Sequence, residues 1–132
     1  MAFEPRRNFW QRGPARTMRP ALERRTHIAL ADLLRVACRP NWWWSHIPSG
    51  ELRSEETGAL LKRMGLTPGM SDFLFIAPSG EHCWLELKRG SAPLSQRQLD
   101  FQSMLRRRGV KCAVARSYAQ AVEVLKSWEV LP

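Results

Sequence analysis

SDFLFI (residues 71–76), PSG (residues 78–80) and WLELK (residues 84–88) make up the stretch of sequence that decides the fold. Two runs rich in aromatic and aliphatic residues stand on either side of a Pro/Ser/Gly cluster, which is typical of two antiparallel strands joined by a short turn. The stretch therefore predicts a β-hairpin.

The predicted hairpin carries three charged side chains near its open end. Successive side chains of a strand point to opposite faces, so Glu86 and Lys88 share one face while the leucines beside them share the other. With the turn centred near Ser79, Asp72 and Glu86 are cross-strand neighbours, with Cβ atoms roughly 5 Å apart. A turn shifted by one residue would make them a diagonal pair, still within reach of one ion. We expect two carboxylates and a lysine to converge on one edge of a small sheet.

These residue types suit a particular chemistry. Two carboxylates this close repel unless a proton or a cation lies between them, and Mg²⁺ prefers such oxygen ligands while leaving positions for water and substrate phosphate. The metal would lower the pKa of a bound water for phosphodiester hydrolysis. Lys88 would orient that water or stabilise the developing negative charge. The alternative interpretation is a surface hairpin in which Glu86 and Lys88 form an ordinary ion pair worth little.

Length and charge narrow the class of protein. The chain has 132 residues, which suffices for one domain with a real core, and its formal net charge is +9. An acidic partner is therefore expected, first of all nucleic acid, because phosphate neutralisation by Lys and Arg supplies most non-specific affinity. A membrane surface is the weaker alternative, and no segment approaches the roughly 20 apolar residues that span a bilayer.

The chain divides into two parts by composition. Residues 1–19 mix proline, glycine and several arginines, which predicts a mobile basic arm that either follows a nucleic-acid backbone or is a solvated tail. Residues 20–132 are expected to form the single folded domain. Cys38, Cys83 and Cys112 lack the spacing of a disulfide framework or a zinc site, which indicates reduced thiols in a cytoplasmic protein.

A helical pattern extends from Pro20 to about Ala37, since proline suits a first helical position. Glu23 and His27 are four residues apart and therefore neighbours on the helix surface. They could add a metal ligand beside the hairpin, although a glutamate in a first turn also stabilises the helix dipole. The apolar residues expected to share one face are Leu22, Ala29, Leu33 and Val36.

The remaining segments complete an α/β pattern. We expect a strand at Trp42–Trp44, a loop at residues 45–50, a helix after Ser54, a helix after Ser95, a strand at residues 110–115 and a helix after Ser117. Ser95 and Gln98 form a capping box, and Gln98 would also lie close enough to the hairpin to contact a phosphate or water. The order predicts a small mixed β-sheet flanked by helices.

In order and spacing, the motifs resemble the VRR-NUC (virus-type replication-repair nuclease) branch of the PD-(D/E)XK nuclease superfamily. The resemblance runs from about His46 to Trp128. Its motifs are His46-Ile47-Pro48 with Arg53, Leu61-Lys62-Arg63-Met64-Gly65, Gly69-Met70-Ser71-Asp72, Leu85-Glu86-Leu87-Lys88, Leu94-Ser95-Gln96-Arg97-Gln98, and the strand 109–115 with its following helix.

The resemblance implies a restriction-endonuclease-like core and a Mg²⁺- or Mn²⁺-dependent phosphodiesterase acting on DNA. Asp72 and Glu86 would be metal ligands, Lys88 would stand at the attacking water, and Gln98 would support the site. A glutamate on the first helix completes the site in many relatives, and Glu23 is the best-placed candidate. Stand-alone members are similar to structure-specific nucleases, including homodimers that cut four-way DNA junctions.

Two positions depart from the family pattern, with Ser71 in place of a proline and Ser49 in place of an asparagine. Loss of the proline puts the rigidity of the site in doubt more than its chemistry. The sequence thus predicts a metal-dependent DNA endonuclease for branched DNA, resembling a Holliday-junction resolvase, in the cytoplasm of a bacterial or phage-infected cell. The alternatives are a non-catalytic nucleic-acid-binding module on a nuclease fold and a restriction-type nuclease for linear duplex.

Overall fold

Four helices and four strands alternate in the computed structural model, which describes residues 14–48 and 54–132 and, within the first helix, side chains from residue 23 onwards. Ser49, Arg53 and most of the expected N-terminal arm (residues 1–13) lie outside the described residues. In chain order the elements are α1 (Pro14–Ala37), β1 (Trp43–His46), α2 (Glu55–Arg63), β2 (Phe73–Ile76), β3 (His82–Leu87), α3 (Gln96–Arg107), β4 (Lys111–Ala115) and α4 (Tyr118–Ser127).

The hairpin β2–β3 lies at the centre of a mixed sheet with the strand order β1-β2-β3-β4. β1 pairs with β2 and β2 with β3 in antiparallel fashion, whereas β4 runs parallel to β3. Phe73 is opposite Leu85 in the ladder, so one step further out Asp72 comes opposite Glu86. The predicted hairpin and its register, centred on Ser79, are confirmed.

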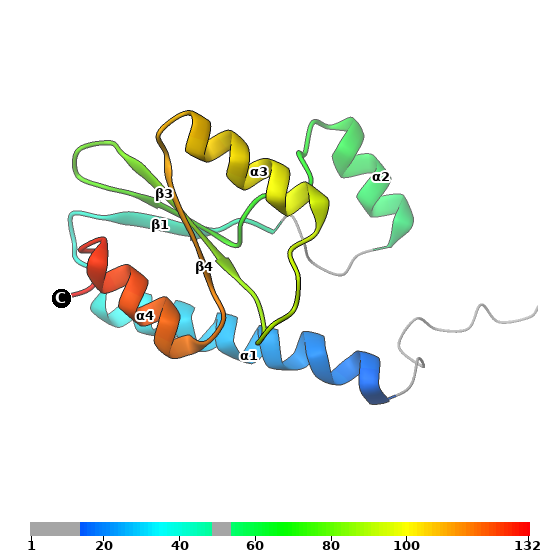
Figure 1. Cartoon of the computed structure of the whole chain (residues 1–132), viewed down its shortest axis with the longest axis horizontal. Helices are drawn as coiled ribbons and strands as arrows, with labels where there is room; N and C mark the ends of the chain where they lie inside the picture. Colours follow the sequence, from blue (N-terminus) through cyan, green and yellow to red (C-terminus); the bar gives the residue numbers. More distant parts are fainter. Residues whose placement is uncertain (1–13, 49–53) are drawn as a thin grey trace, which may run out of the picture.

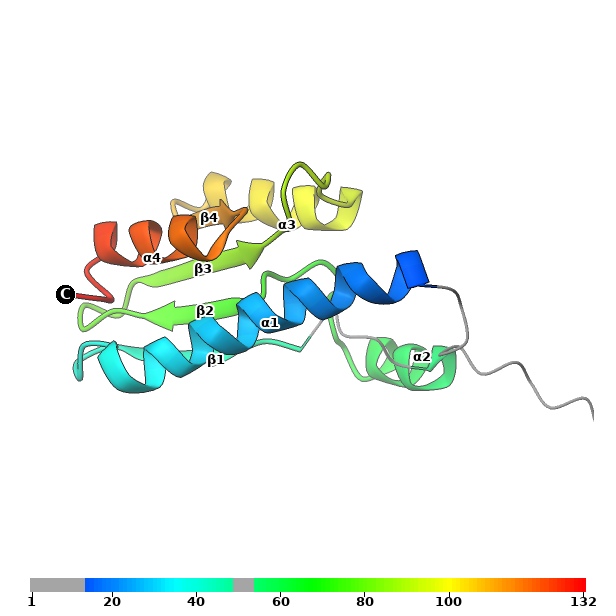
Figure 2. The same ribbon diagram turned by 90° about the horizontal axis from the view of Figure 1, so that it is seen from below.

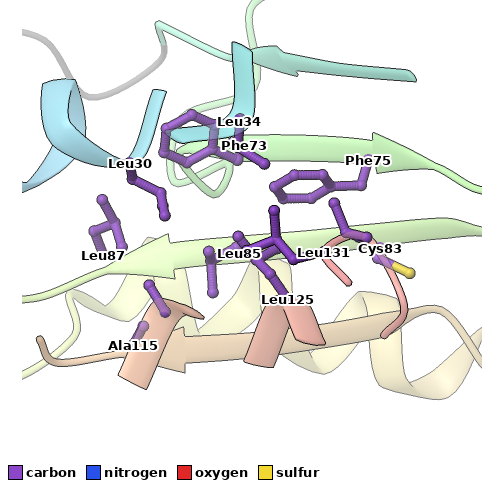
Figure 3. Packing of buried hydrophobic residues seen from close by; sticks show 12 residues of the cluster. Leu30, Leu34, Phe73, Phe75, Cys83, Leu85, Leu87, Ala115, Leu125 and Leu131 are labelled. Atoms are coloured by element: carbon purple, nitrogen blue, oxygen red, sulfur yellow. The ribbon is translucent and has the colours of Figure 1, made fainter. Parts of the chain in front are cut away.

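The core lies on one face of the sheet, under α1 and α4. Phe73, Phe75 and Leu85 point from the strands toward Leu30 of α1 and Leu125 of α4, and all five side chains are fully buried. Figure 3 shows these residues between the ribbons of the sheet and the helices. Burying each contributes about 1.5–3 kcal/mol, so this face fixes the hairpin firmly in place.

The opposite face is covered over β3 and β4 by α3, on the other side of the sheet from α1 and α4 (Figure 1). Trp84 meets Phe101 of α3 edge to face, with ring centroids 5.0 Å apart. The side chain of Glu86, on the same face, is buried as well. Over β1 the face remains open, because Trp43 is 54 % exposed. The central hairpin therefore has helices on both sides at the end that carries the charged residues.

Several expected boundaries are corrected by the structure. α1 begins at Pro14 and not at Pro20, so the last six residues of the predicted arm are helical. Proline suits the first turn of a helix at either position, and the sequence could not choose between them. Ser45 and His46, which were expected in a loop, belong to β1, where backbone pairing with β2 outweighs the local loop signal.

The buried face of α1 also differs from the expected one. Leu30 and Leu34 are buried, whereas Ala29 is exposed and Val36 is 89 % exposed. Apolar residues lie on more than one side of the helix, so spacing alone allows two candidate buried faces about 100° apart around the helix axis. Contact with the phenylalanines of β2 selects the stripe of Leu30 and Leu34.

Helix caps follow the sequence closely. The Ser54 side chain accepts a hydrogen bond from the Thr57 amide, and Ser95 and Gln98 form the full reciprocal capping box.

α2 buries no residue, and Figure 2 shows it away from the sheet and the other helices. Among the described residues, no helix has the length and apolar character needed to cross a membrane.

Candidate active site

Two carboxylates meet where the hairpin opens, as the register of β2 and β3 predicts. Asp72 Oδ2 accepts a hydrogen bond of 2.7 Å from the backbone amide of Leu87, and the Asp72 and Glu86 side chains share a hydrogen bond. On its other side, Glu86 Oε1 accepts from Gln98 Nε2 at 2.8 Å. The pair is therefore held in place from both sides by groups of the chain itself.

The electrostatics of the pair follow from its burial. The pKa of Glu86 is raised from 4.5 to about 8, first by burial and then by the charge of Asp72, while Lys88 opposes the rise. Burial also raises the pKa of Asp72, against the lowering effect of the Leu87 amide. Two negative charges at this spacing need a proton or a cation between them. The raised pKa of Glu86 favours a proton on the pair, and the carboxylate oxygens are of the type that could hold a cation instead.

Gln98 closes the predicted capping box, and its side chain also contacts Glu86; a contact with phosphate or water stays a prediction. Its backbone amide donates to Ser95 Oγ at 3.2 Å, and its Oε1 accepts from the Ser95 amide at 2.9 Å. The remaining amide group, Nε2, points to Glu86. The cap of α3 thus fixes the rotamer of the side chain that holds the glutamate, so the two roles depend on each other.

A cavity of about 290 Å³ is lined by residues of α1, by Leu87 and Lys88, which follow Glu86 in the chain, and by residues at the end of β4. Glu23 of α1 lines it from one side and Lys88, Arg89 and Arg116 from the sheet side. The charge of Glu23 raises the pKa of both Asp72 and Glu86. α1 therefore places Glu23 where its charge acts on both carboxylates, and three cations line the same cavity as Glu23.

Glu23 does not join the two carboxylates in a compact ligand cluster. Within residues 14–48 and 54–132, no group of three or more His, Cys, Asp or Glu side chains is gathered so that it could hold a metal ion. The close pair is formed by Asp72 and Glu86. A ligand role for Glu23 stays a prediction.

His46 is a residue of the site that residue chemistry alone did not single out. Its Nδ1 lies 2.9 Å from the carbonyl oxygen of Asp72, and because a carbonyl only accepts, this nitrogen carries the proton. The same carbonyl accepts from the Ile47 amide at 2.8 Å. The His46 ring contacts that of His27 edge to face, with centroids 4.3 Å apart. The family resemblance includes His46 in a motif without giving it a role, and the pairing of β1 with β2, which places His46 opposite Phe73, explains its contact with Asp72.

The segment before Asp72 is fixed without the family's proline. Ser71 is fully buried, and a Cβ atom on Gly69 would lie 2.5 Å from the backbone carbonyl carbon of Arg97. Gly69 also has a φ of +88°, which an L side chain rarely adopts. This close approach joins the strand that carries Asp72 to the first turn of α3, where Gln98 lies.

Arg116, at the end of β4, holds the loop between Lys88 and α3. Its Nη1 donates to the carbonyl oxygens of Gly90 at 3.0 Å and Ala92 at 2.6 Å. Sequence patterns gave no signal for this contact, because the two ends are more than twenty residues apart. The loop that connects the lysine to the capping box is therefore fixed from β4.

Comparison with known proteins gives a likeness of fold. No protein-family model and no curated protein matches the chain. One solved structure, a "VRR_NUC domain protein", is similar with a TM-score of 0.65 and 20% identity over 80% of this chain and 86% of the other. A second, a "VRR_NUC domain", has a TM-score of 0.55 and 20% identity over 80% and 96%. The chain therefore shares the fold of these VRR_NUC domain structures, a mixed sheet flanked by helices.

Proposed function

We propose that the protein is a metal-dependent DNA endonuclease that hydrolyses phosphodiester bonds, with its active site at Asp72, Glu86 and Lys88. The observation that carries the proposal is the buried carboxylate pair, whose pKa values are raised and which is aligned by Leu87 and Gln98. A structural ion pair would not need two acids facing each other in a partly dry site. The nuclease fold of the two similar structures supports the same conclusion.

The side chains at the site fit a hard divalent cation. Their donor atoms are carboxylate oxygens, which Mg²⁺ and Mn²⁺ prefer, and a cation would replace the proton that the pair shares. Asp72 and Glu86 would hold it, with Glu23, whose charge acts on both carboxylates, as the proposed third ligand. A bound Mg²⁺ or Mn²⁺ supplies Lewis acidity, which lowers the pKa of water and neutralises charge on a phosphate.

The other residues act by position and charge. Lys88 brings a compact cation beside the carboxylates, where it orients the attacking water or stabilises negative charge on the phosphate. Gln98 keeps the Glu86 carboxylate in one orientation, which spares reorganisation during the reaction. Arg89 and Arg116 line the entrance and favour a phosphate there. Because these cations would contact phosphates and not base edges, the affinity for DNA should fall steeply as the salt concentration rises.

For the substrate we propose branched DNA, cut by a homodimer. A four-way junction presents two symmetry-related phosphates, and a dimer with C₂ symmetry presents two active sites in a matching arrangement. The net charge of +9 supports a nucleic-acid substrate, and the resemblance to junction-cutting nucleases supports this shape of substrate. Sequence-specific cleavage of linear duplex is the alternative that the experiment must separate.

The test is cleavage of a labelled four-way junction beside flap, single-stranded and linear duplex controls, in Mg²⁺, Mn²⁺ and EDTA. Wild type is compared with Lys88→Ala, and Lys126→Ala in α4, far along the chain from the site, is the matched control. We expect paired cuts in the junction that require the metal and vanish only in Lys88→Ala. Cleavage of the linear duplex alone would favour the restriction-type alternative. Tight binding without cuts in either metal would make the protein a binding module.

A further inference from the structure

A second hollow lies between α1 and β1, and His46 is one of its lining residues. It has a volume of about 450 Å³, within the usual range for small-ligand sites. Four of its lining residues come from one side of α1, and three consecutive residues come from β1. The lining residues are His27, Ile28, Ala31, Arg35, Trp44, Ser45 and His46. We call it the α1–β1 groove.

From α1, small and large side chains alternate along the groove. Ala31 forms its floor, and Ile28 and Arg35, about one turn away on either side, rise beside it. Ile28 is 52 % exposed, and the Arg35 guanidinium pairs with Asp32 at 3.0 Å in an exposed position. A leucine in place of Ala31 would fill this space. The groove therefore owes its existence to one small residue.

The β1 side of the groove is aromatic. The Trp44 ring is anchored on the core through Phe73, with centroids 6.1 Å apart, and only part of it is covered. The Arg35 guanidinium carbon lies 6.0 Å from the centroid of this ring. A partly exposed indole with an arginine over it is a surface on which a planar ring can stack while its phosphate contacts the cation.

We propose that the α1–β1 groove is a stacking site for an unpaired nucleobase of the DNA strand that enters the active site. His46 belongs to both sites, since it lines the groove and its Nδ1 contacts the Asp72 carbonyl. A strand that extends from the Asp72 segment across His46 would place a base in the groove beside Trp44. The net charge of +9 favours a DNA strand over a peptide without acidic residues or an apolar ligand. The inference rests on the proposed function, because it takes DNA as the substrate.

Binding in EDTA tests the groove without requiring cleavage. The probes are a fluorescein-labelled oligothymidylate and an oligomer of the same length made of abasic sites, which keeps the phosphates and removes the bases. We expect wild type to bind the oligothymidylate about 5- to 100-fold more tightly, as stacking of one base allows. Ala31→Leu should abolish this preference. Ala29→Leu, with the same change at an exposed position of α1, should keep it.

A second pair of variants separates an effect on binding from an effect on folding. Ile28→Asp places a carboxylate at the groove, and Ala29→Asp places the same charge on an exposed position one residue away. Ile28→Asp should weaken binding of the oligothymidylate more than Ala29→Asp does. Equal binding of both probes by wild type, or a preference that survives in folded Ala31→Leu, would overturn the inference. Loss of the preference in Trp43→Ala alone would also overturn it, and would place the base on the open sheet face. Failure of cleavage with the preference intact would refute the proposed reaction and leave the groove standing.

Discussion

Glu86→Gln offers a sharp test of the carboxylate pair, because glutamine has the same shape and carries no charge. In the metal-free protein the buried Glu86 has its pKa raised to about 8 by burial, by Asp72 and by Glu23, against the effect of Lys88. The folded protein therefore binds a proton that the unfolded chain has already released above its ordinary pKa of 4.5. By linkage, the free energy of unfolding contributed by this group falls as pH rises from 4.5 through about 8. Glutamine removes that dependence.

The size of the effect follows from the two pKa values. A difference between 4.5 and about 8 corresponds to about 5 kcal/mol at alkaline pH, since one pKa unit is worth 1.36 kcal/mol. Between roughly pH 5.5 and pH 8.5 the loss amounts to about 3 kcal/mol. The Gln98 hydrogen bond can persist in the variant, since a glutamine oxygen also accepts.

Denaturant unfolding in EDTA over this pH range measures the effect for wild type and Glu86→Gln. We expect wild type to lose about 3 kcal/mol more than the variant, so that the variant is the more stable protein at alkaline pH. Glu81→Gln is the matched control, because Glu81 is exposed at the hairpin turn, and it should behave like wild type. If the free energies of unfolding of wild type and Glu86→Gln changed in parallel with pH, the raised pKa of the buried Glu86 would be refuted.

Three further predictions concern the groups that hold the site. Gly69→Ala should lower the free energy of unfolding by about 2 kcal/mol or more, since it adds left-handed strain to a collision with the Arg97 backbone; unchanged denaturant midpoints would contradict that contact. Gln98→Ala should cost about 1–2 kcal/mol in the same assay, because it removes a helix cap and a partner of Glu86, and a neutral result would rule out the double role. Arg116→Ala should speed amide hydrogen exchange in residues 89–95 about tenfold through the loss of two hydrogen bonds, and unaltered exchange there would show that the loop is fixed by other means.

The hairpin and its acids were predictable because their signals are local. The turn at Ser79 sets the register, and register alone brings Asp72 opposite Glu86. The capping box of Ser95 and Gln98 is local too, and the structure contains it as predicted.

The parts that escaped prediction depend on contacts between distant segments. α3 covers Glu86, and that burial raises its pKa far more than the spacing of two acids suggests. His46 reaches the Asp72 backbone only because β1 pairs with β2, and Arg116 meets its loop only because β4 runs parallel to β3. The predicted buried face of α1 was wrong for the same reason. Leu30 and Val36 are both apolar, and only their neighbours in the fold decide that Leu30 is buried and Val36 exposed.

Single-turnover cleavage by Asp72→Asn is the most direct test of whether Asp72 and Glu86 form the site of DNA hydrolysis. The variant keeps the size of the side chain and removes the charge, and Asp100→Asn on the exposed side of α3 is its control. With DNA binding measured in parallel, we expect Asp72→Asn to bind with affinity close to wild type and to lose cleavage in Mg²⁺ and Mn²⁺. Asp100→Asn should cut like wild type. Cleavage by Asp72→Asn at the wild-type rate would contradict the assignment of the active site.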